Sequence, residues 1–164
     1  MKWRNHALMG VSIAIMMDLN PWEVGLCAFG SNLPDQLEKI GRFRIFGHRA
    51  LTHELLLWLV PFVTFLLLPV LSKSTSGPAG TILPLETVAF THFLAVRTWV
   101  LFLPGLIHLA GDVMTPRGIQ VAGRRVSLKL FETGQVLEYL VSALFVGLAV
   151  VHKLGWENVF PGGP

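Results

Sequence analysis

The chain has few charged residues and a single cysteine, and each shortage excludes a class of protein. Asp, Glu, Lys and Arg make up 14% of the 164 residues, whereas hydrophobic residues make up 52%. Soluble domains carry about 25% charged residues, so this composition is typical of a membrane protein. The lone Cys27 excludes an intrachain disulfide, and because it lies in an apolar run we expect it to pack as a small apolar side chain.

The chain also lacks internal repeats, a domain linker and a recognisable cleavage site. Lys2 and Arg4 precede an apolar run, as in a signal peptide, but Asp18 follows that run and no small-x-small pattern stands there. We therefore expect the N-terminus to be retained, and residues 1–164 to form one integral-membrane domain.

Three apolar stretches are candidates for membrane-spanning helices. A helix needs about 20 mostly apolar residues to cross about 30 Å of hydrocarbon. The stretches are Glu54–Leu71, Thr98–Ala110 extended backward toward Thr87, and Gly134–Val151. The second contains His92 and Arg97, so we expect its outer half to be buried in protein or to lie at the membrane interface.

Before the first of these stretches, the sequence predicts a hairpin of two short helices. An apolar run, Ala7–Met17, is interrupted by a turn in which Asn20 suits an N-cap, Pro21 suits the first helical position and Glu23 can reach back to the cap. Each helix would be about 15 Å long, half the thickness of a bilayer. The predicted fold is thus an all-α polytopic membrane bundle, with a short N-terminal hairpin and about three spanning helices.

The net charge of +3 reflects two basic loops. The two groups are Lys39, Arg42, Arg44 and Arg49, and Arg117, Arg124, Arg125 and Lys129. The positive-inside rule explains both groups if the two loops share the cytoplasmic side of a bacterial inner membrane. Nucleic-acid binding is not needed to account for the charge, and we do not expect it.

Asp35 is the first candidate metal ligand. It follows a turn that contains Gly30 and Pro34, directly after the second short helix is predicted to end. Loops held by rigid elements often carry functional side chains, yet a lone turn aspartate is more often simply solvated. Glu38, one turn further on, is a weaker candidate.

His48 and His53 stand five residues apart, just before the strongest apolar stretch. On one continuous helix this spacing turns the two side chains about 140° apart, so they would diverge. They converge only if His48 lies in a loop and His53 opens the helix, with Thr52 as its N-cap. Two histidines beside a carboxylate loop are as consistent with a metal site as with structural roles.

His108 and Asp112 carry the sharpest local signal. Positions i and i+4 lie on one helix face, with Cβ atoms about 6 Å apart. The imidazole and the carboxylate can share a divalent ion such as Zn²⁺, or the carboxylate can orient the histidine. They can also cap the helix end without metal, but charged groups at membrane depth are costly without a partner, which favours a functional role.

Glu138 lies four residues into the last apolar stretch, where an unpaired carboxylate would bind a proton or a cation. It is a candidate ligand or general base. His92 lies sixteen residues before His108, about 160° around a continuous helix, so it is left out of the predicted site. His152, at the far end of the stretch, is expected to be interfacial.

Four sequence blocks stand in order along most of the chain. They are His6, Gly30-Ser31-Asn32-Leu33-Pro34-Asp35, His48-Arg49-Ala50-Leu51-Thr52-His53, and His108-Leu109-Ala110-Gly111-Asp112-Val113-Met114-Thr115-Pro116-Arg117-Gly118. Together they resemble the YdjM-type (LexA-regulated) membrane-bound metal-dependent hydrolases. The resemblance implies the metal-site residues His6, Asp35, His48, His53, His108 and Asp112, with Glu138 matching a late family glutamate. Leu37, Ala50 and Glu54 depart from the family pattern, which bears on the metal count and the substrate.

The predicted function is a metal-dependent hydrolase that uses metal-activated water on a lipid or nucleotide-like phosphoester at the cytoplasmic face. The candidate catalytic residues are Asp112, Glu138 and Arg49, and Arg49, Arg117 or Arg124 could bind the substrate phosphate. The expected partners are the bilayer and a phosphoester substrate, and the expected cofactor is one or more divalent ions, with Zn²⁺ favoured. A non-catalytic metal-binding or transport protein and a structural assembly factor are the alternatives. Clustering of the ionisable groups at one end favours an accessible site over a transporter.

Overall fold

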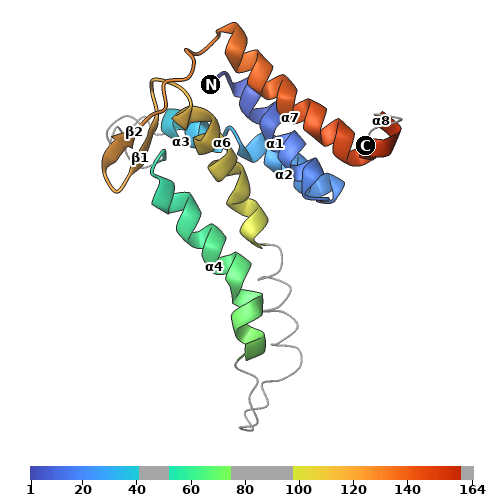
Figure 1. Cartoon of the computed structure of the whole chain (residues 1–164). Helices are drawn as coiled ribbons and strands as arrows, with labels where there is room; N and C mark the ends of the chain where they lie inside the picture. Colours follow the sequence, from blue (N-terminus) through green and yellow to red (C-terminus); the bar gives the residue numbers. More distant parts are fainter. Residues whose placement is uncertain (41–51, 75–97, 160–164) are drawn as a thin grey trace.

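The computed structural model describes residues 1–40, 52–74 and 98–159, and these are mostly helical (Figure 1). The elements are α1 (Trp3–Met16), α2 (Pro21–Gly30), α3 (Leu33–Ile40), α4 (Leu55–Ser74), a 3₁₀ helix η1 (Trp99–Leu101), α6 (Leu103–Val113), β1 (Ile119–Val121), β2 (Arg124–Val126), α7 (Val136–Leu154) and α8 (Trp156–Val159). The predicted helical class is confirmed, with a short two-stranded sheet in addition.

The predicted N-terminal hairpin is confirmed, including its cap. The backbone N–H of Glu23 donates to Asn20 Oδ1 at 3.0 Å, and the backbone N–H of Asn20 donates to Glu23 Oε2 at 2.9 Å. This reciprocal pair satisfies two backbone donors that the start of α2 would otherwise leave open. The two helices then approach closely, because a Cβ atom on Gly10 would lie 2.5 Å from the Cys27 carbonyl oxygen.

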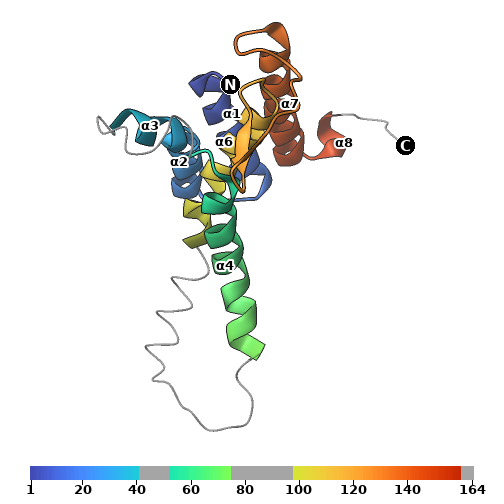
Figure 2. The ribbon, with the colours of Figure 1, turned by 90° about the vertical axis from the view of Figure 1, so that its left-hand side faces the viewer.

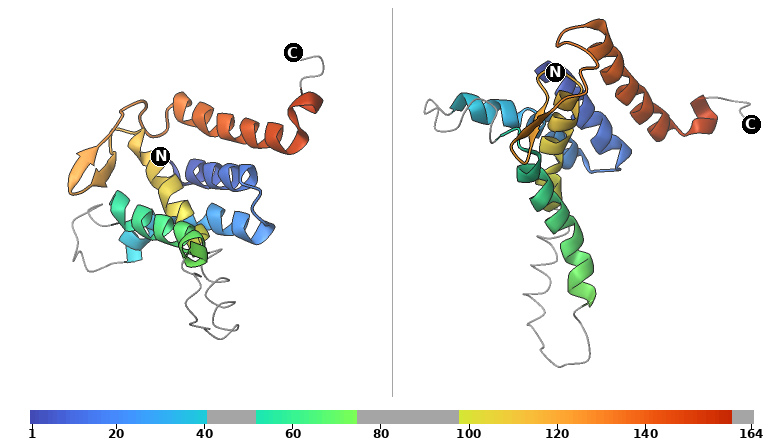
Figure 3. Two further views of the ribbon diagram at one scale, coloured as in Figure 1. Left: turned by 60° about the horizontal axis from the view of Figure 1, so that its bottom comes forward. Right: turned by 60° about the vertical axis from the view of Figure 1, so that its left-hand side comes forward.

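Helix α7 lies along α1, and both run in the same direction from the end of the molecule where the chain starts. At that end the Asn5 amide donates to Glu138 Oε1 at 2.6 Å, and at the other end Lys153 Nζ donates to Asp18 Oδ1 at 2.6 Å. The left view of Figure 3 shows α1 between α2 and α7. Both ends of the hairpin's first helix are therefore tied to α7.

Helix α6 packs against the first turns of α4. A Cβ atom on Gly105 would lie 2.0 Å from Trp58 Cε3, so the indole rests directly on the α6 backbone. The Trp58 indole N–H donates to the Thr52 carbonyl at 2.9 Å, which ties the start of α4 to the residues before it. Because α4 begins at Leu55, the residue before its first turn is Glu54, and the prediction that Thr52 caps this helix is wrong.

A two-stranded antiparallel hairpin follows α6. Strands β1 and β2 pair Ile119 with Val126, and the Ala122–Gly123 turn has positive φ at both residues, +50° and +74°. This is the backbone that a two-residue type I′ hairpin needs. The Glu54 carboxylate accepts from both turn N–H groups, from Ala122 at 2.8 Å and from Gly123 at 3.4 Å.

Within the described residues, one helix is long and apolar enough to cross a membrane, and it is α7. Helix α4 forms as predicted and extends away from the remaining helices (Figure 2). Its described apolar part, Leu55–Leu68, is shorter than that of α7. Helix α6 has 11 residues, about 16 Å, which is too short to span a bilayer alone. The predicted count of about three spans is not confirmed, and residues 87–97 of the second stretch lie outside the described residues.

Candidate metal centre

Five of the predicted metal-site side chains meet where the start of α1, the start of α3, the start of α4 and the end of α6 converge (Figure 1). They are His6 on α1, Asp35 on α3, His53 just before α4, and His108 and Asp112 on α6. Four of them are almost completely buried, and the Asp35 side chain keeps 30% exposure. The short N-terminal hairpin makes this possible, because it brings α3 back to the end where α1 begins.

One group of possible ligand atoms contains Asp35, His53 and His108. The Nε2 atoms of His53 and His108 are 3.2 Å apart, and Asp35 Oδ1 lies 3.4 Å from the first and 3.8 Å from the second. Two ligands at about 2.0–2.1 Å from a tetrahedral zinc ion are about 3.3 Å apart. The donor atoms are thus spaced as neighbouring ligands of one ion would be.

A second group shares His108 and adds His6 and Asp112. Asp112 Oδ1 lies 3.4 Å from His6 Nε2, and Asp112 Oδ2 lies 3.6 Å from His108 Nε2 and 3.4 Å from His53 Nε2. The His6 and His108 rings stack with centroids 4.0 Å apart. The Met1 amino group also contacts Asp112 Oδ1 at 2.7 Å. Asp112 therefore connects all three imidazoles.

Two of the histidines are oriented from outside the cluster. His108 Nδ1 lies 2.7 Å from the Ser31 carbonyl oxygen, and His53 Nδ1 lies 3.1 Å from Glu38 Oε1. A carbonyl oxygen only accepts, so His108 must carry its proton on Nδ1, which leaves an Nε2 lone pair that faces the cluster. Such outer partners are what metal-binding histidines typically have.

The sequence interpretation ranked Glu38 low and missed Ser31. Glu38 lies three residues after Asp35, and both belong to α3, so a carboxylate pair on one helix face was the available signal. The Thr52 hydroxyl also donates to Glu38 Oε1, at 3.1 Å, which holds the carboxylate against His53. Ser31 acts through its backbone carbonyl, so its side chain carried no signal.

Burial and the neighbouring imidazoles set the charge state of the cluster. Burial lowers the pKa of His6 to about 4, so this ring is neutral at pH 7. Burial raises the pKa of Asp35, but the contact with His53 outweighs it and brings the value to about 2. For Asp112, burial is likewise outweighed by the three imidazoles, which hold its pKa far below the ordinary range. Neutral imidazoles and ionised carboxylates are the forms that bind a cation.

His6 provides a direct test of whether a metal would fit. Its side chain is 0% exposed, and neither ring nitrogen makes a hydrogen bond among the described residues, although Nε2 lies 3.4 Å from Asp112 Oδ1. Leaving buried polar atoms unsatisfied costs about 1–3 kcal/mol each. Imidazole nitrogen beside carboxylate oxygen is the donor set that zinc and similar divalent ions take. The residues present therefore fit a divalent cation.

Glu138 lies outside both groups of possible ligands. One carboxylate oxygen accepts from the backbone N–H of Lys2 at 2.5 Å and from the Asn5 amide at 2.6 Å, and the other accepts from the Gly134 N–H. The carboxylate therefore holds the first turn of α1, which carries His6, against the start of α7.

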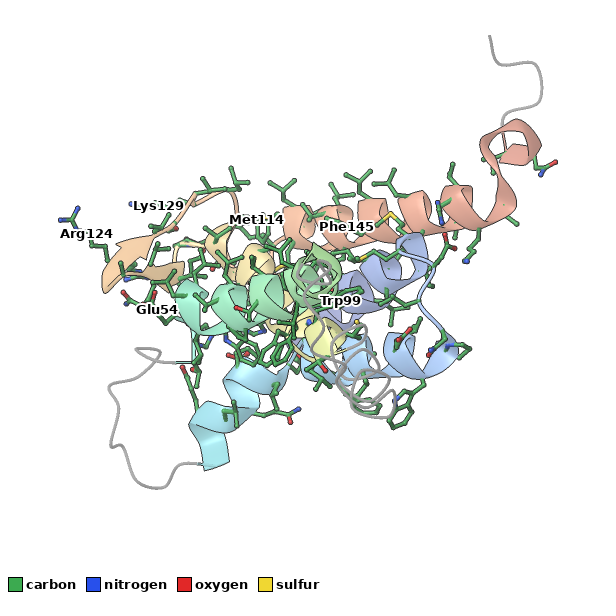
Figure 4. The ribbon with its side chains drawn as sticks, turned by 90° about the horizontal axis from the view of Figure 1, so that it is seen from below. Glu54, Trp99, Met114, Arg124, Lys129 and Phe145 are labelled. Atoms are coloured by element: carbon green, nitrogen blue, oxygen red, sulfur yellow. The ribbon has the colours of Figure 1, made fainter. Side chains whose placement is uncertain are left out.

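The basic residues of the loop after α6 differ in their surroundings. The Arg125 guanidinium donates to the Arg117 and Pro116 carbonyls, both at 2.7 Å, and so fixes the base of the sheet. Arg124 and Lys129 point away from the body of the molecule in Figure 4. His48 and Arg49, which the sequence predicts to belong to the site, lie outside the described residues.

The fold and the site define a class: a mainly helical protein with a helix able to cross a membrane, and a buried cluster of histidines and carboxylates that could hold a metal ion. Within that class, the model of the YdjM inner membrane protein family matches residues 1–155, and the chain belongs to this family. The resemblance seen in the four blocks is thereby confirmed. No curated protein and no solved structure gives a significant match to the chain.

Proposed function

We propose that this protein is a metal-dependent hydrolase of the inner membrane that cleaves a phosphoester at the cytoplasmic face. One observation carries the proposal: donor atoms of three imidazoles and two carboxylates, from four separate elements, lie 3.2–3.8 Å apart in a buried cluster. Groups with such perturbed pKa values gather at functional sites more often than elsewhere.

Zinc is the ion that this donor set suits best, since it favours nitrogen and oxygen ligands at close spacing. When bound, a divalent cation supplies Lewis acidity, which polarises a phosphoryl oxygen and makes water a competent nucleophile near neutral pH. His53 and His108 would hold it through Nε2, because their Nδ1 atoms are engaged by Glu38 and Ser31.

The exposure of the cluster's side chains indicates the side from which a substrate would approach. Asp35 is the one partly exposed member of the cluster, so the substrate phosphate would arrive from its side. The ionised Asp112, connected to all three imidazoles, would keep their nitrogens directed at the position of the cation, which in turn would face the reacting phosphate. Arg49, within the sequence block from His48 to His53, is the candidate to bind the phosphate oxygens.

The membrane arrangement belongs to the same proposal. Helices α4 and α7 would span the bilayer, and the two basic loops would lie in the cytoplasm, as the positive-inside rule favours. Exposed leucines along α7, such as Leu140, Leu144 and Leu148, support contact with lipid. The metal cluster at the start of both helices would then open on the cytoplasmic side.

The test measures metal content and phosphoesterase activity together. In detergent-purified protein, His108→Ala and Asp112→Ala should each remove bound zinc, measured by elemental analysis, and reduce activity by at least about 100-fold. His152→Ala is the matched control, because this exposed histidine contacts Asp18 far from the cluster. Activity that survives in a metal-free double variant would exclude the mechanism, and zinc uptake into sealed vesicles without hydrolysis would favour transport instead.

A further inference from the structure

An apolar cleft lies beside the candidate metal centre, between α1, α2 and α3. Its volume is about 470 Å³, within the range of about 300–1,000 Å³ that is usual for sites of small ligands. Its wall is mostly apolar, formed by Trp3 and Ala7 of α1 and by Ala28 and Phe29 of α2. The cleft is thus large enough for part of a substrate, and it suits an apolar part.

Asp35 belongs to both the cleft and the cluster. It lines the cleft, and its Oδ1 lies 3.4 Å from His53 Nε2 and 3.8 Å from His108 Nε2. A molecule in the cleft would therefore have one end at the metal ligands. A carboxylate and a phosphate group at this distance repel each other unless a cation lies between them. A phosphate head group therefore fits this end of the cleft when a cation is bound at the cluster.

The rim of the cleft carries exposed aromatic rings. The side chains of Trp3 and Phe29 are 63% and 80% exposed, which is unusual for large aromatic residues in contact with water. Aromatic residues gather at membrane interfaces, where one side meets hydrocarbon and the other meets water. In an inner-membrane protein, such a rim allows a chain from the lipid phase to enter the cleft.

The wall also contains a buried polar atom without a hydrogen-bond partner. Asn32 is 8% exposed, and its Oδ1 has no hydrogen-bond partner among the described residues. Asn32 lies three residues before Asp35, so this polar part of the wall stands at the end of the cleft that meets the cluster. The wall is thus polar near the cluster and apolar toward the rim.

We propose that this cleft binds the hydrocarbon chain of an amphiphilic phosphoester whose phosphate lies at the metal centre. The inference rests on the proposed function and narrows its substrate class to lipid-like molecules. A nucleotide would place a polar base against Ala7, Ala28 and two aromatic rings, where most of its hydrogen bonds to water would be lost without replacement.

The test uses two phosphonates, which carry a phosphate-like head but no ester bond to hydrolyse. Zinc-loaded protein in lipid nanodiscs is titrated with dodecylphosphonate and with methylphosphonate in a calorimeter. The dodecyl form should bind at least about 10-fold more tightly, because each buried methylene adds favourable transfer free energy. Ala28→Phe, which fills the cleft, should remove most of this difference and leave methylphosphonate binding unchanged.

Gly25→Phe is the matched control, because it adds the same ring to α2 at a position with open space around it. Partition of dodecylphosphonate into the lipid is the same for both variants at one lipid concentration, so it does not affect the difference between their affinities. Ala7→Leu fills the same cleft from α1. It replaces Ala28→Phe in the titration if Ala28→Phe does not bind zinc or shows no cooperative thermal unfolding.

The outcomes separate the two proposals. Equal affinity of wild-type protein for both phosphonates, or an equal loss in Gly25→Phe, would overturn the cleft assignment and leave the hydrolase proposal standing. If neither phosphonate binds to zinc-loaded protein, the proposed function fails and the cleft assignment fails with it.

Discussion

Gly111 illustrates how closely the cluster is packed at the scale of single residues. It lies between the two metal-site residues of α6, and a Cβ atom there would be 3.0 Å from His6 Nδ1 and 2.7 Å from Met1 Sδ. Contacts of 3.0 Å and less to carbon force a neighbour to move. The absence of a side chain at this position is therefore what lets the His6 ring stack on His108.

Gly111→Ala should weaken zinc binding by about 10-fold or more while the fold is retained. The added methyl group displaces His6, but alanine is the better helix former by about 1 kcal/mol, which offsets part of the steric cost. Zinc affinity by chelator competition and melting temperature together provide the measurement. Gly147→Ala on α7, where nothing lies within 4 Å, should keep its zinc. Unchanged affinity in Gly111→Ala would show that His6 is not a ligand.

His6 should also make the metal-free protein sensitive to acid. Its folded pKa of about 4 lies below the ordinary 6.5, so the unfolded state binds more protons between these values. The stability that this group contributes is fully present above pH 6.5 and is lost as the pH falls toward 4, by about 3 kcal/mol at most. Melting temperatures of zinc-free protein between pH 7.5 and 5 should fall more steeply for wild type than for His6→Gln. Equal slopes would contradict the burial argument.

Glu54 is the contact that matters most at the scale of elements, because it joins the start of α4 to the hairpin. Its carboxylate accepts from two turn N–H groups, and the backbone N–H of Gln120 donates to the His53 carbonyl at 2.9 Å. In Figure 4, Glu54 lies beside the hairpin, close to its turn end, where Arg124 begins β2. The hairpin thus holds the backbone of a candidate metal ligand.

Glu54→Ala should speed amide hydrogen exchange in residues 119–126 several-fold, because the turn loses the acceptor that holds it. The contact is solvent-exposed, so the loss in unfolding free energy should be about 1 kcal/mol or less. Hydrogen exchange followed by mass spectrometry measures the local effect. Glu132→Ala, outside the sheet, is the control, and equal exchange in the two variants would exclude a clamping role for Glu54.

At the scale of the whole molecule, the proposal predicts which side of the membrane each end of α7 faces. If α7 spans the membrane with the basic loops inside, the two ends of that helix lie on opposite sides. A cysteine at Asn158 should then react with an impermeant maleimide in intact spheroplasts, and one at Arg124 should react only after permeabilisation. Both positions are exposed. Labelling of both cysteines in intact spheroplasts would contradict the proposed topology.

The native thiol should not interfere with this experiment. Cys27 is 0% exposed, and burial raises its pKa to about 11, so little reactive thiolate forms near neutral pH. Cys27→Ala provides the background in which any residual labelling is removed.

Local features were predictable because their physics is local. The capping pair of Asn20 and Glu23 depends on a three-residue spacing, and His108 and Asp112 share a face because a helix repeats every 3.6 residues. The hairpin of two short helices followed from a proline placed after a polar turn. These features, and the four blocks that mark the family, could be recognised without coordinates.

Only the tertiary structure decided which distant groups meet. Helix packing brings His53 Nε2 to 3.2 Å from His108 Nε2 and places Ser31 and Glu38 where they orient the two rings. Helix packing also decides that Glu138 accepts from the start of α1 instead of joining the cluster. The same holds for the apolar cleft beside Asp35. Spacing along the chain determines direction around one helix, whereas packing between helices is set by side-chain shape and burial across the whole molecule.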